Sequence, residues 1–444
     1  MEGGWRLAAT CALLAGCGGG RDGNGGAADA AGPGDGGASF DGGARDAGGE
    51  PAEGPIEIRI VKEEFPPVDG APVLLYDASG SFLGETATDA EGTATAVVRT
   101  GSMAVILLPE FDFGDNESIV VAGVEPGDHI LFFDEYTGGE SSASMDVEVA
   151  AHPGAGVYYV FRACSETFSS VPQATLDIPE HCIVDGKVGI GVLAYDDSGL
   201  LAYLFDEVEY GDAATLGGTW AAPDPLEVSF RDIPPGIKKV SAQVWMMSGD
   251  QRYAEFGEVE ATIDGDRATL SPMDGPTSYG AERVVSLEVI RTQFMIAFQT
   301  ADHRIAGDSA GLSLDTRDEL LPWYTGPAYS PETQTLTWTR SASGREPDAI
   351  YVKTYWVETG SDRGGTIHWI LPPGPNAVVI PPLPAAHAAR LPQRPSETYH
   401  QVTAVERSDW EGYRPARQTG WLAAHPEYDV PAPFTIRRSD AISQ

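Results

Sequence analysis

Short apolar or alternating runs, separated by turns rich in Gly, Pro, Asp and Asn, recur along most of this 444-residue chain. Such runs are typical of β-strands, whereas sustained 3.6-residue apolar spacing, the mark of a long helix, is sparse. Evenly spaced short strands predict sandwiches or barrels. The clearest predicted strands are 56–60, 73–76, 94–98, 104–108, 130–133, 157–161, 188–195, 226–230, 240–245 and 336–338.

We therefore expect an all-β fold of two or three tandem antiparallel β-sandwiches after a disordered tether rich in Gly, Ala and Asp. About 390 residues follow this tether, which is too many for one ordinary hydrophobic core. The expected divisions are a signal peptide at 1–16, a lipidated Cys and tether at 17–54, and sandwiches at 55–161, 162–283 and 284–444.

The N-terminus carries a short apolar segment that ends in Leu14-Ala15-Gly16-Cys17. The run from Leu7 to Ala15 is far too short to span a bilayer, so it indicates an export signal. The last four residues resemble the lipobox of bacterial lipoproteins. This resemblance implies cleavage before Cys17, acylation of Cys17 by palmitate-type chains, and a membrane anchor through that lipid. Members of this family that stay in the inner membrane often have Asp directly after the Cys, so Gly18 favours the outer membrane. The alternative to a lipobox is a cytosolic N-terminus in which Cys17 is incidental.

Residues 18–50 consist mainly of Gly, Ala and Asp. A segment of this composition cannot bury enough apolar surface to offset the entropy lost on ordering. We interpret it as a flexible tether with an end-to-end distance of roughly 30 Å by random-coil scaling.

The charge balance restricts the partners. The chain has 66 acidic against 28 basic residues, a formal net charge of -38. A surface this acidic repels phosphate backbones, which excludes nucleic acid as a ligand and argues against direct adhesion to anionic membranes.

The cysteines divide into two groups. Cys11 would leave with the signal peptide and Cys17 would carry lipid, so Cys164 and Cys182 form an even pair. In an oxidising compartment such a pair indicates a disulfide, worth roughly 3 kcal/mol on the loop-entropy argument. A metal site that uses His181 beside Cys182 is the alternative, but no fourth ligand has recognisable spacing.

The first expected sandwich has a local motif. Residues 68–77 read VDGAPVLLYD and residues 88–92 read TDAEG. Asp89 suits a turn in which its carboxylate caps backbone N–H groups, and Gly92 suits a positive φ. This pattern resembles the carboxypeptidase-regulatory-like β-sandwich over roughly a sixth of the chain. The resemblance implies a structural or transport-associated module and not a catalyst.

Aromatic residues gather in the last expected sandwich, which has six of the nine Trp and a composition similar to fibronectin type III domains. Trp323 and Tyr324, in a Pro-flanked loop, are our candidates for stacking on a sugar ligand. The alternative is that they fill the core, as Trp usually does in β-sandwiches.

The segment 307–311 reads GDSAG and resembles the nucleophile elbow of lipases and esterases, with Ser309 as the nucleophile. That elbow needs a buried strand before it and a packed helix after it, and neither pattern flanks this segment. A loop between strands also explains the residues. Acid and base residues that follow in the order of such a triad are Asp348 or Asp362, then His368, His400 or His425.

The acidic turns allow one further alternative. Asp69, Asp77, Asp89 and Glu91 would bind Ca²⁺ if their oxygens converged, but the spacing favours capping of turns by their side chains. No motif for a catalytic metal, a nucleotide or a dinucleotide is found, so we expect no metal and no cofactor.

These observations predict a lipid-anchored protein of the cell envelope, in the outer membrane and facing the periplasm or the surface. We expect a non-catalytic binding or scaffolding role, with the membrane as partner through the lipid and a protein or glycan as ligand. The alternatives are a carbohydrate-binding surface protein and a serine hydrolase that uses Ser309.

Overall fold

The computed structural model describes residues 52–61, 67–108, 116–133, 142–162, 165–169, 171–179, 183, 185–222, 224–248, 251–275, 283–291, 297–305, 311–330, 332–358, 363–391, 396–419 and 435–443. Every described residue belongs to one compact unit, Ala38–Gln444. The expected signal peptide, Cys17 and the tether at 18–50 lie outside the described residues.

The N-terminal part forms a sandwich of two β-layers. One layer has the order β4-β1-β7, in which β1 is antiparallel to β4 and parallel to β7. Alternate residues of β1, Ile56, Ile58 and Ile60, are buried against the second layer, as a strand covered on one face requires. The strands are β1 (Glu53–Val61), β4 (Thr93–Arg99) and β7 (His129–Phe133) in one layer, with β2 (Pro72–Tyr76), β3 (Phe82–Ala87), β5 (Ser102–Leu107) and β6 (Asn116–Val124) in the other.

Two acidic turns of this sandwich are capped by their own side chains. Asp77 Oδ1 accepts hydrogen bonds from the backbone N–H groups of Ser79 and Ser81, both at 2.9 Å. Asp89 Oδ1 accepts from the N–H groups of Glu91 and Thr93 at 3.1 and 2.8 Å. Gly92 has a φ of +72°. The predicted turn at 88–92 is therefore confirmed.

A second sandwich follows, with its own core around Val147, Val160, Leu176 and Val192. The predicted division between residues 161 and 162 falls inside β9, which pairs with β12 of the same sandwich. One sheet has the order β10-β9-β12-β13 and the other β11-β8-β14. The strands are β8 (Ser142–Val149), β9 (Val157–Arg162), β10 (Ser165–Ser169), β11 (Gln173–Pro179), β12 (Lys187–Asp196), β13 (Gly199–Glu209) and β14 (Ala213–Leu216).

The next part packs a sheet of order β18-β19-β15-β22 against β16, β17, β20 and β21, around Val228, Leu270 and Leu287. The short helix α1 (Thr316–Glu319) begins after Asp315, whose side chain accepts from the N–H of Arg317. The strands are β15 (Asp224–Arg231), β16 (Lys239–Ser248), β17 (Gln251–Glu260), β18 (Thr262–Asp264), β19 (Arg267–Gly275), β20 (Arg283–Ile290), β21 (Ala297–Ile305) and β22 (Gly311–Asp315).

The C-terminal part packs the sheet β23-β24-β27 against β25, β26, β28 and β29, and includes the short helix α2. Its largest fully buried side chains are Trp356 and Trp369. The elements are β23 (Tyr324–Ser330), β24 (Thr335–Arg340), β25 (Ala349–Glu358), β26 (Gly364–Leu371), β27 (Ala377–Val379), the 3-10 helix η3 (Ala388–Arg390), β28 (Ser396–Arg407), α2 (Tyr413–Thr419) and β29 (Thr435–Ser443).

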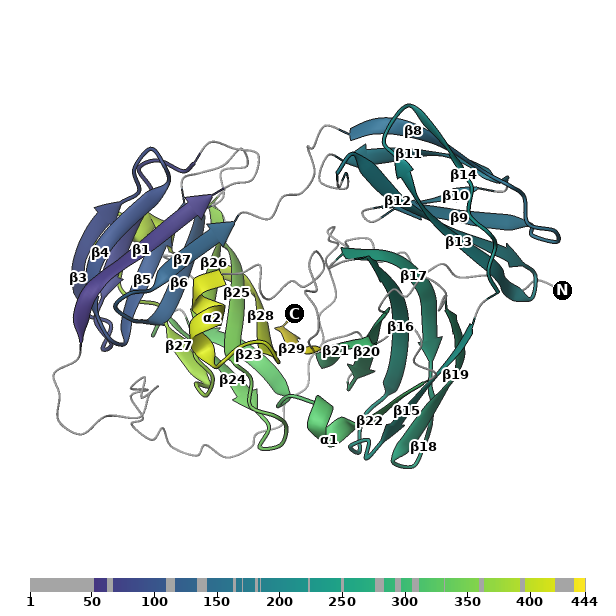
Figure 1. Ribbon diagram of the computed structural model, residues 1–444. Helices are drawn as coiled ribbons and strands as arrows, with labels where there is room; N and C mark the ends of the chain where they lie inside the picture. The colour runs from purple at the N-terminus through teal and green to yellow at the C-terminus, as the bar shows by residue number, and fades with distance from the viewer. Residues whose placement is uncertain are drawn as a thin grey trace. The chain divides into compact units, whose positions relative to one another are not determined.

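One sheet runs through three of these parts. It has 12 strands in the order β17-β16-β20-β21-β29-β28-β25-β26-β6-β5-β2-β3. The N-terminal part joins it through the parallel pair β6–β26, in register from Asn116↔Gly365 to Val121↔Ile370 (Figure 1). The pair β21–β29 joins the third and C-terminal parts. The predicted all-β fold of β-sandwiches is confirmed, and this shared sheet is an additional finding.

Alternate residues of the shared sheet enter different cores. In β25, Tyr351 belongs to the core that is covered by the layer β4-β1-β7 and α2, whereas Ile350 and Val352 belong to the core beneath β23-β24-β27. In β5, Ile106 belongs to the first of these cores and Val105 to the second. β5 and the first four residues of β25, Ala349 to Val352, are buried on both faces, which explains their continuous apolar sequences.

Candidate functional site

One face of the shared sheet changes from a buried core to an exposed surface along β28, β25, β26 and β6. Residues paired across these strands lie on the same face, so the strand register places them in rows. We call the two outer rows the tyrosine face. The first row is Tyr399, Tyr355, Thr366 and Glu117, and the second is Gln401, Lys353 and His368.

The two tyrosines are the most exposed members of this face. The exposed fraction is 40% for Tyr355 and 38% for Tyr399, while the other five residues are half-buried. Tyr355 and Tyr399 are register partners on neighbouring strands, which places their Cβ atoms about 5 Å apart. Two large aromatic side chains therefore stand side by side on a sheet whose opposite face is buried at Trp356.

Polar contacts fix the surroundings of the tyrosines. His368 Nε2 lies 3.0 Å from Glu117 Oε1. Gln401 Nε2 donates to Asp440 Oδ1 at 3.1 Å, and Thr403 Oγ1 donates to the same oxygen. Burial, and secondly the negative charge of Asp440, raise the pKa of Tyr399. The Tyr399 hydroxyl is therefore protonated at neutral pH and can donate a hydrogen bond.

The inner end of this face is covered by α2. Tyr351 and Ile370, one row further in, are fully buried, and Tyr351 Oη donates to the carbonyl oxygen of Ala416 at 3.4 Å. Tyr413 Oη lies 2.8 Å from the carbonyl oxygens of both Ala122 and Ile370, which belong to β6 and β26. Tyr413 thus bridges the parallel strand pair that joins the N- and C-terminal parts.

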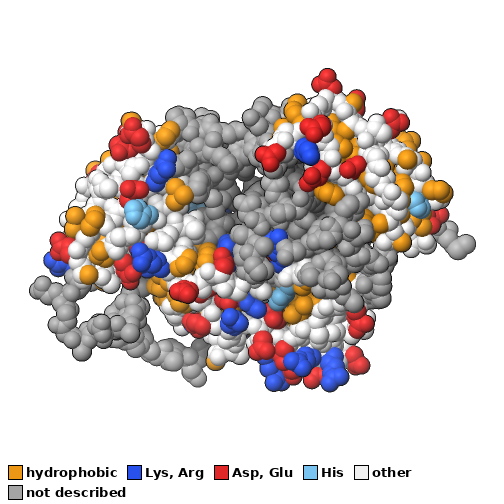
Figure 2. All heavy atoms as spheres, in the orientation of Figure 1, with side chains coloured by type: hydrophobic (Ala, Val, Ile, Leu, Met, Phe, Trp, Pro, Cys, Tyr) orange, Lys and Arg blue, Asp and Glu red, His pale blue; other side chains and the backbone are white. Residues whose placement is uncertain are grey.

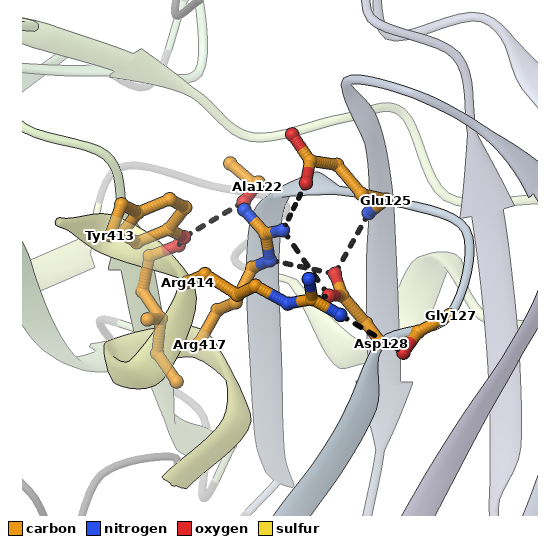
Figure 3. Close-up of polar contacts among 8 residues, drawn as sticks. Ala122, Glu125, Gly127, Asp128, Tyr413, Arg414 and Arg417 are labelled. Atoms are coloured by element: carbon orange, nitrogen blue, oxygen red, sulfur yellow. Dashed lines mark hydrogen bonds and ion pairs between the residues drawn. The ribbon is translucent and has the colours of Figure 1, made fainter. Parts of the chain in front are cut away.

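Buried charges hold α2 in this position. Arg417 Nε donates to Asp128 Oδ2 at 2.6 Å, and Arg417 Nη2 donates to Glu125 Oε2 at 2.6 Å (Figure 3). Arg414 Nε lies 3.5 Å from Asp128 Oδ1. The Asp128 side chain is fully buried and the Arg417 side chain is 4% exposed. We call these four residues the α2 ion-pair cluster; it connects α2 to the β6–β7 turn.

Trp323 and Tyr324 do not contribute to an exposed surface. Trp323 is 6% exposed in the core of the third part, and Tyr324 is fully buried in the C-terminal core. Burial raises the pKa of Tyr324 to about 12. Neither ring presents a face on which a sugar could stack, because the chain passes between two cores at this point.

The residues considered for a Ser309 triad are separated where the structure describes them. Asp348 Oδ2 accepts from the N–H of Arg407, at the start of β25. His400 on β28 is the register partner of Thr354, which lies six residues after Asp348, and His400 Nδ1 is 3.2 Å from Thr354 Oγ1. His368 is on the opposite face of the sheet from His400. Ser309, Asp362 and His425 lie outside the described residues.

The structure describes none of the cysteines that the sequence predicts as lipidation or disulfide sites. Cys17, Cys164 and Cys182 lie outside the described residues, and so the lipid and the disulfide stay predictions. Within the described part of the chain, no three His, Cys, Asp or Glu side chains are grouped to hold a metal ion. A cavity of about 10 Å³ near Phe230 and Leu320 is far smaller than ordinary ligand pockets.

The alternation of residues in β25 and β28 is a sequence signal for the tyrosine face. In β25, Tyr355 precedes Trp356, and alternation places one ring outside and the other inside. In β28, Tyr399 and Gln401 are two residues apart and therefore point to the same face. Alternation identifies the outward residues, but only the pairing of β25 with β28 brings the two tyrosines together.

Comparison with known proteins gives no assignment. No protein-family model and no curated protein matches the chain. A candidate adhesin from Bacteroides ovatus aligns with 39% of this chain and 93% of its own at 9% identity and a TM-score of 0.17. The Bacillus anthracis TIE protein aligns with 59% of this chain and 49% of its own at 10% identity and a TM-score of 0.15. The titin domains A168-A170 align at 12% identity, over 76% of this chain and 93% of theirs, with a TM-score of 0.13. TM-scores this low carry no argument about fold or function.

Proposed function

We propose that this chain is a non-catalytic binding protein of the cell envelope, attached to the outer membrane through acyl chains on Cys17. The observation that carries the binding role is the tyrosine face, because two tyrosines about two-fifths exposed lie together on a sheet buried behind them. Exposed aromatic residues surrounded by polar side chains are typical of recognition surfaces.

The architecture supports this role. Three parts of the chain share one sheet, which fixes the tyrosine face on strands with neighbours on both sides. A site on such strands keeps its geometry better than a site on loops. No helix within the described residues has the length and apolarity to cross a bilayer. The lipobox motif supplies the proposed attachment.

Labelling with a fatty-acid analogue tests the anchor. The wild-type chain, produced in a Gram-negative host, should incorporate the label and sediment with membranes, and Cys17→Ser should do neither. Cys11→Ser is the matched control and should behave as wild type. Label in Cys17→Ser, or none in wild type, would refute the anchor.

An ester-hydrolysis assay tests the non-catalytic role. The purified wild-type chain and Ser309→Ala should release product from short-chain p-nitrophenyl esters at the same background rate. A rate in wild type that Ser309→Ala abolishes would establish the hydrolase instead.

A further inference from the structure

We infer that the tyrosine face binds a neutral oligosaccharide, with Tyr355 and Tyr399 as the residues on which the sugar rings stack. This inference rests on the proposed binding function and names the class of ligand. It differs from the expectation at Trp323 and Tyr324, whose rings are buried.

The spacing of the two rings suits a chain of sugars. Neighbouring strands lie about 5 Å apart, so register partners on β25 and β28 present two adjacent rings. This spacing is close to the length of one hexose unit. The C–H groups on one side of a pyranose are apolar and weakly positive, and they pack against the negative face of an aromatic ring. Tyr355 and Tyr399 would therefore contact successive sugars.

The residues around the rings suit hydroxyl groups. Thr366 combines a donor with an acceptor, and Lys353 adds donors in the second row. The Gln401 amide nitrogen donates to Asp440 and Thr403, which leaves its carbonyl oxygen as an acceptor for the ligand. The contact with Asp440 orients the Gln401 amide. Sugar hydroxyls both donate and accept, so a mixed set of partners satisfies them better than a set of one kind.

The charges favour a neutral ligand over an anionic one. On this face the positive charge of Lys353 is accompanied by the negative charge of Glu117, which is already in contact with His368. The formal net charge of the chain is -38, and acidic side chains are spread over the surface visible in Figure 2. Polyanions such as uronate chains and nucleic acids are repelled by this field.

The position within the sheet disfavours an extended peptide. A peptide that adds to a sheet needs an edge strand with unpaired backbone groups. Both tyrosines lie on strands with neighbours on each side: β25 pairs with β26 and β28, and β28 pairs with β25 and β29. The pairing with β29 begins at His400, directly after Tyr399, so little unpaired strand edge adjoins the two rings. This arrangement suits contacts through side chains.

Binding measurements on the full chain in detergent micelles test the inference. The probes are neutral hexaoses of glucose, mannose, galactose and xylose, two hexauronates, and a set of unstructured peptides. The variants are Tyr355→Ala and Tyr399→Ala, singly and together, and the ring-retaining Tyr355→Phe and Tyr399→Phe. Tyr210→Ala is the matched control, since Tyr210 is 37% exposed but lies after β13 in another sandwich.

Wild type should bind at least one neutral hexaose. Each Ala variant should weaken that affinity about tenfold, which corresponds to about 1.4 kcal/mol. The Phe variants and Tyr210→Ala should bind as wild type within about threefold, and urea midpoints should agree across the set. Three results would overturn the inference: no neutral hexaose is bound, only uronates or peptides are bound, or binding survives the double Ala variant. None of these alters acyl labelling of Cys17 or ester hydrolysis, so the proposed function is tested separately.

Discussion

Replacement of Arg417 by Met should destabilise the chain far more than removal of an exposed Arg. Arg417 is 4% exposed and donates to the fully buried Asp128 at 2.6 Å. Met keeps much of the volume and removes the charge, so the Asp128 carboxylate remains buried without its main partner. The cost therefore comes from a desolvated charge and not from a cavity.

The structure sets the magnitude. Removal of one partner from a buried ion pair costs about 3–5 kcal/mol. Two contacts of Asp128 survive in the variant: the N–H of Glu125 at 2.8 Å and Arg414 Nε at 3.5 Å. We therefore expect about 3 kcal/mol, the lower end of that range. Asp128→Asn in the same chain removes the unpaired charge and keeps an acceptor for Glu125, so the double variant should recover about 1–2 kcal/mol.

Urea denaturation followed by Trp fluorescence measures these changes, because Trp356 and Trp369 are buried in the sheet that α2 covers. The matched control is Arg99→Met. Arg99 Nε lies 3.2 Å from Glu53 Oε2, but the two side chains are 67% and 56% exposed, so its loss should cost less than about 1 kcal/mol. If Arg417→Met costs no more than Arg99→Met, or if Asp128→Asn gives no recovery, the argument from burial is wrong.

Three further changes test the interior of the shared sheet. Burial raises the pKa of Asp348 to about 6, so the stability that its protonated form contributes is present below pH 3.8 and is lost as the pH rises through 6. Asp348→Asn should therefore stabilise the chain at pH 7.5 but not at pH 3.5. An equal gain in the denaturation midpoint at both pH values would contradict this. Burial lowers the pKa of His400 to about 4, so the stability that neutral His400 contributes is complete above pH 6.5 and is lost as the pH falls through 4. Between these pH values the melting temperature of His400→Gln should fall less than that of wild type. The same dependence of melting temperature on pH in both proteins would count against this. A Cβ on Gly365 would lie 2.2 Å from the carbonyl oxygen of Asn116, so Gly365→Ala should lower the free energy of unfolding, measured by urea denaturation, by about 1–3 kcal/mol. Gly84→Ala should change it little, because a Cβ there would have nothing within 4 Å. Equal losses in the two variants would refute the close approach at Gly365.

The strands could be predicted from the sequence, since alternation and turn residues act locally. All ten predicted runs lie in strands of the structure, with only Leu108 one residue beyond β5. The Asp89 turn was predictable for the same reason, because its hydrogen bonds span no more than four residues. The run 73–76 also predicted a strand, but the burial of both its faces is a finding of the structure, where Val73 and Leu75 enter one core and Leu74 and Tyr76 another.

The pairing of distant strands could not be predicted in this way. The side chain of Asn116 donates to the carbonyl of Gly364, 248 residues further along, and no local pattern specifies that neighbour. The same limit applies to the candidate site. Trp323 and Tyr324 have the composition of a binding loop, but the meeting of two cores buries them. Tyr355 and Tyr399 become neighbours only when β25 and β28 pair.

The pairing of β6 with β26 constrains the order in which the chain can mature. Synthesis delivers residues 53–133 long before β26 exists, and until then Leu74, Val105 and Val120 have no β23-β24-β27 layer over them. Contacts this distant in sequence form slowly. A chain whose last third has not yet been made therefore exposes an apolar surface, and this intermediate is prone to aggregate until β23, β24 and β27 are present.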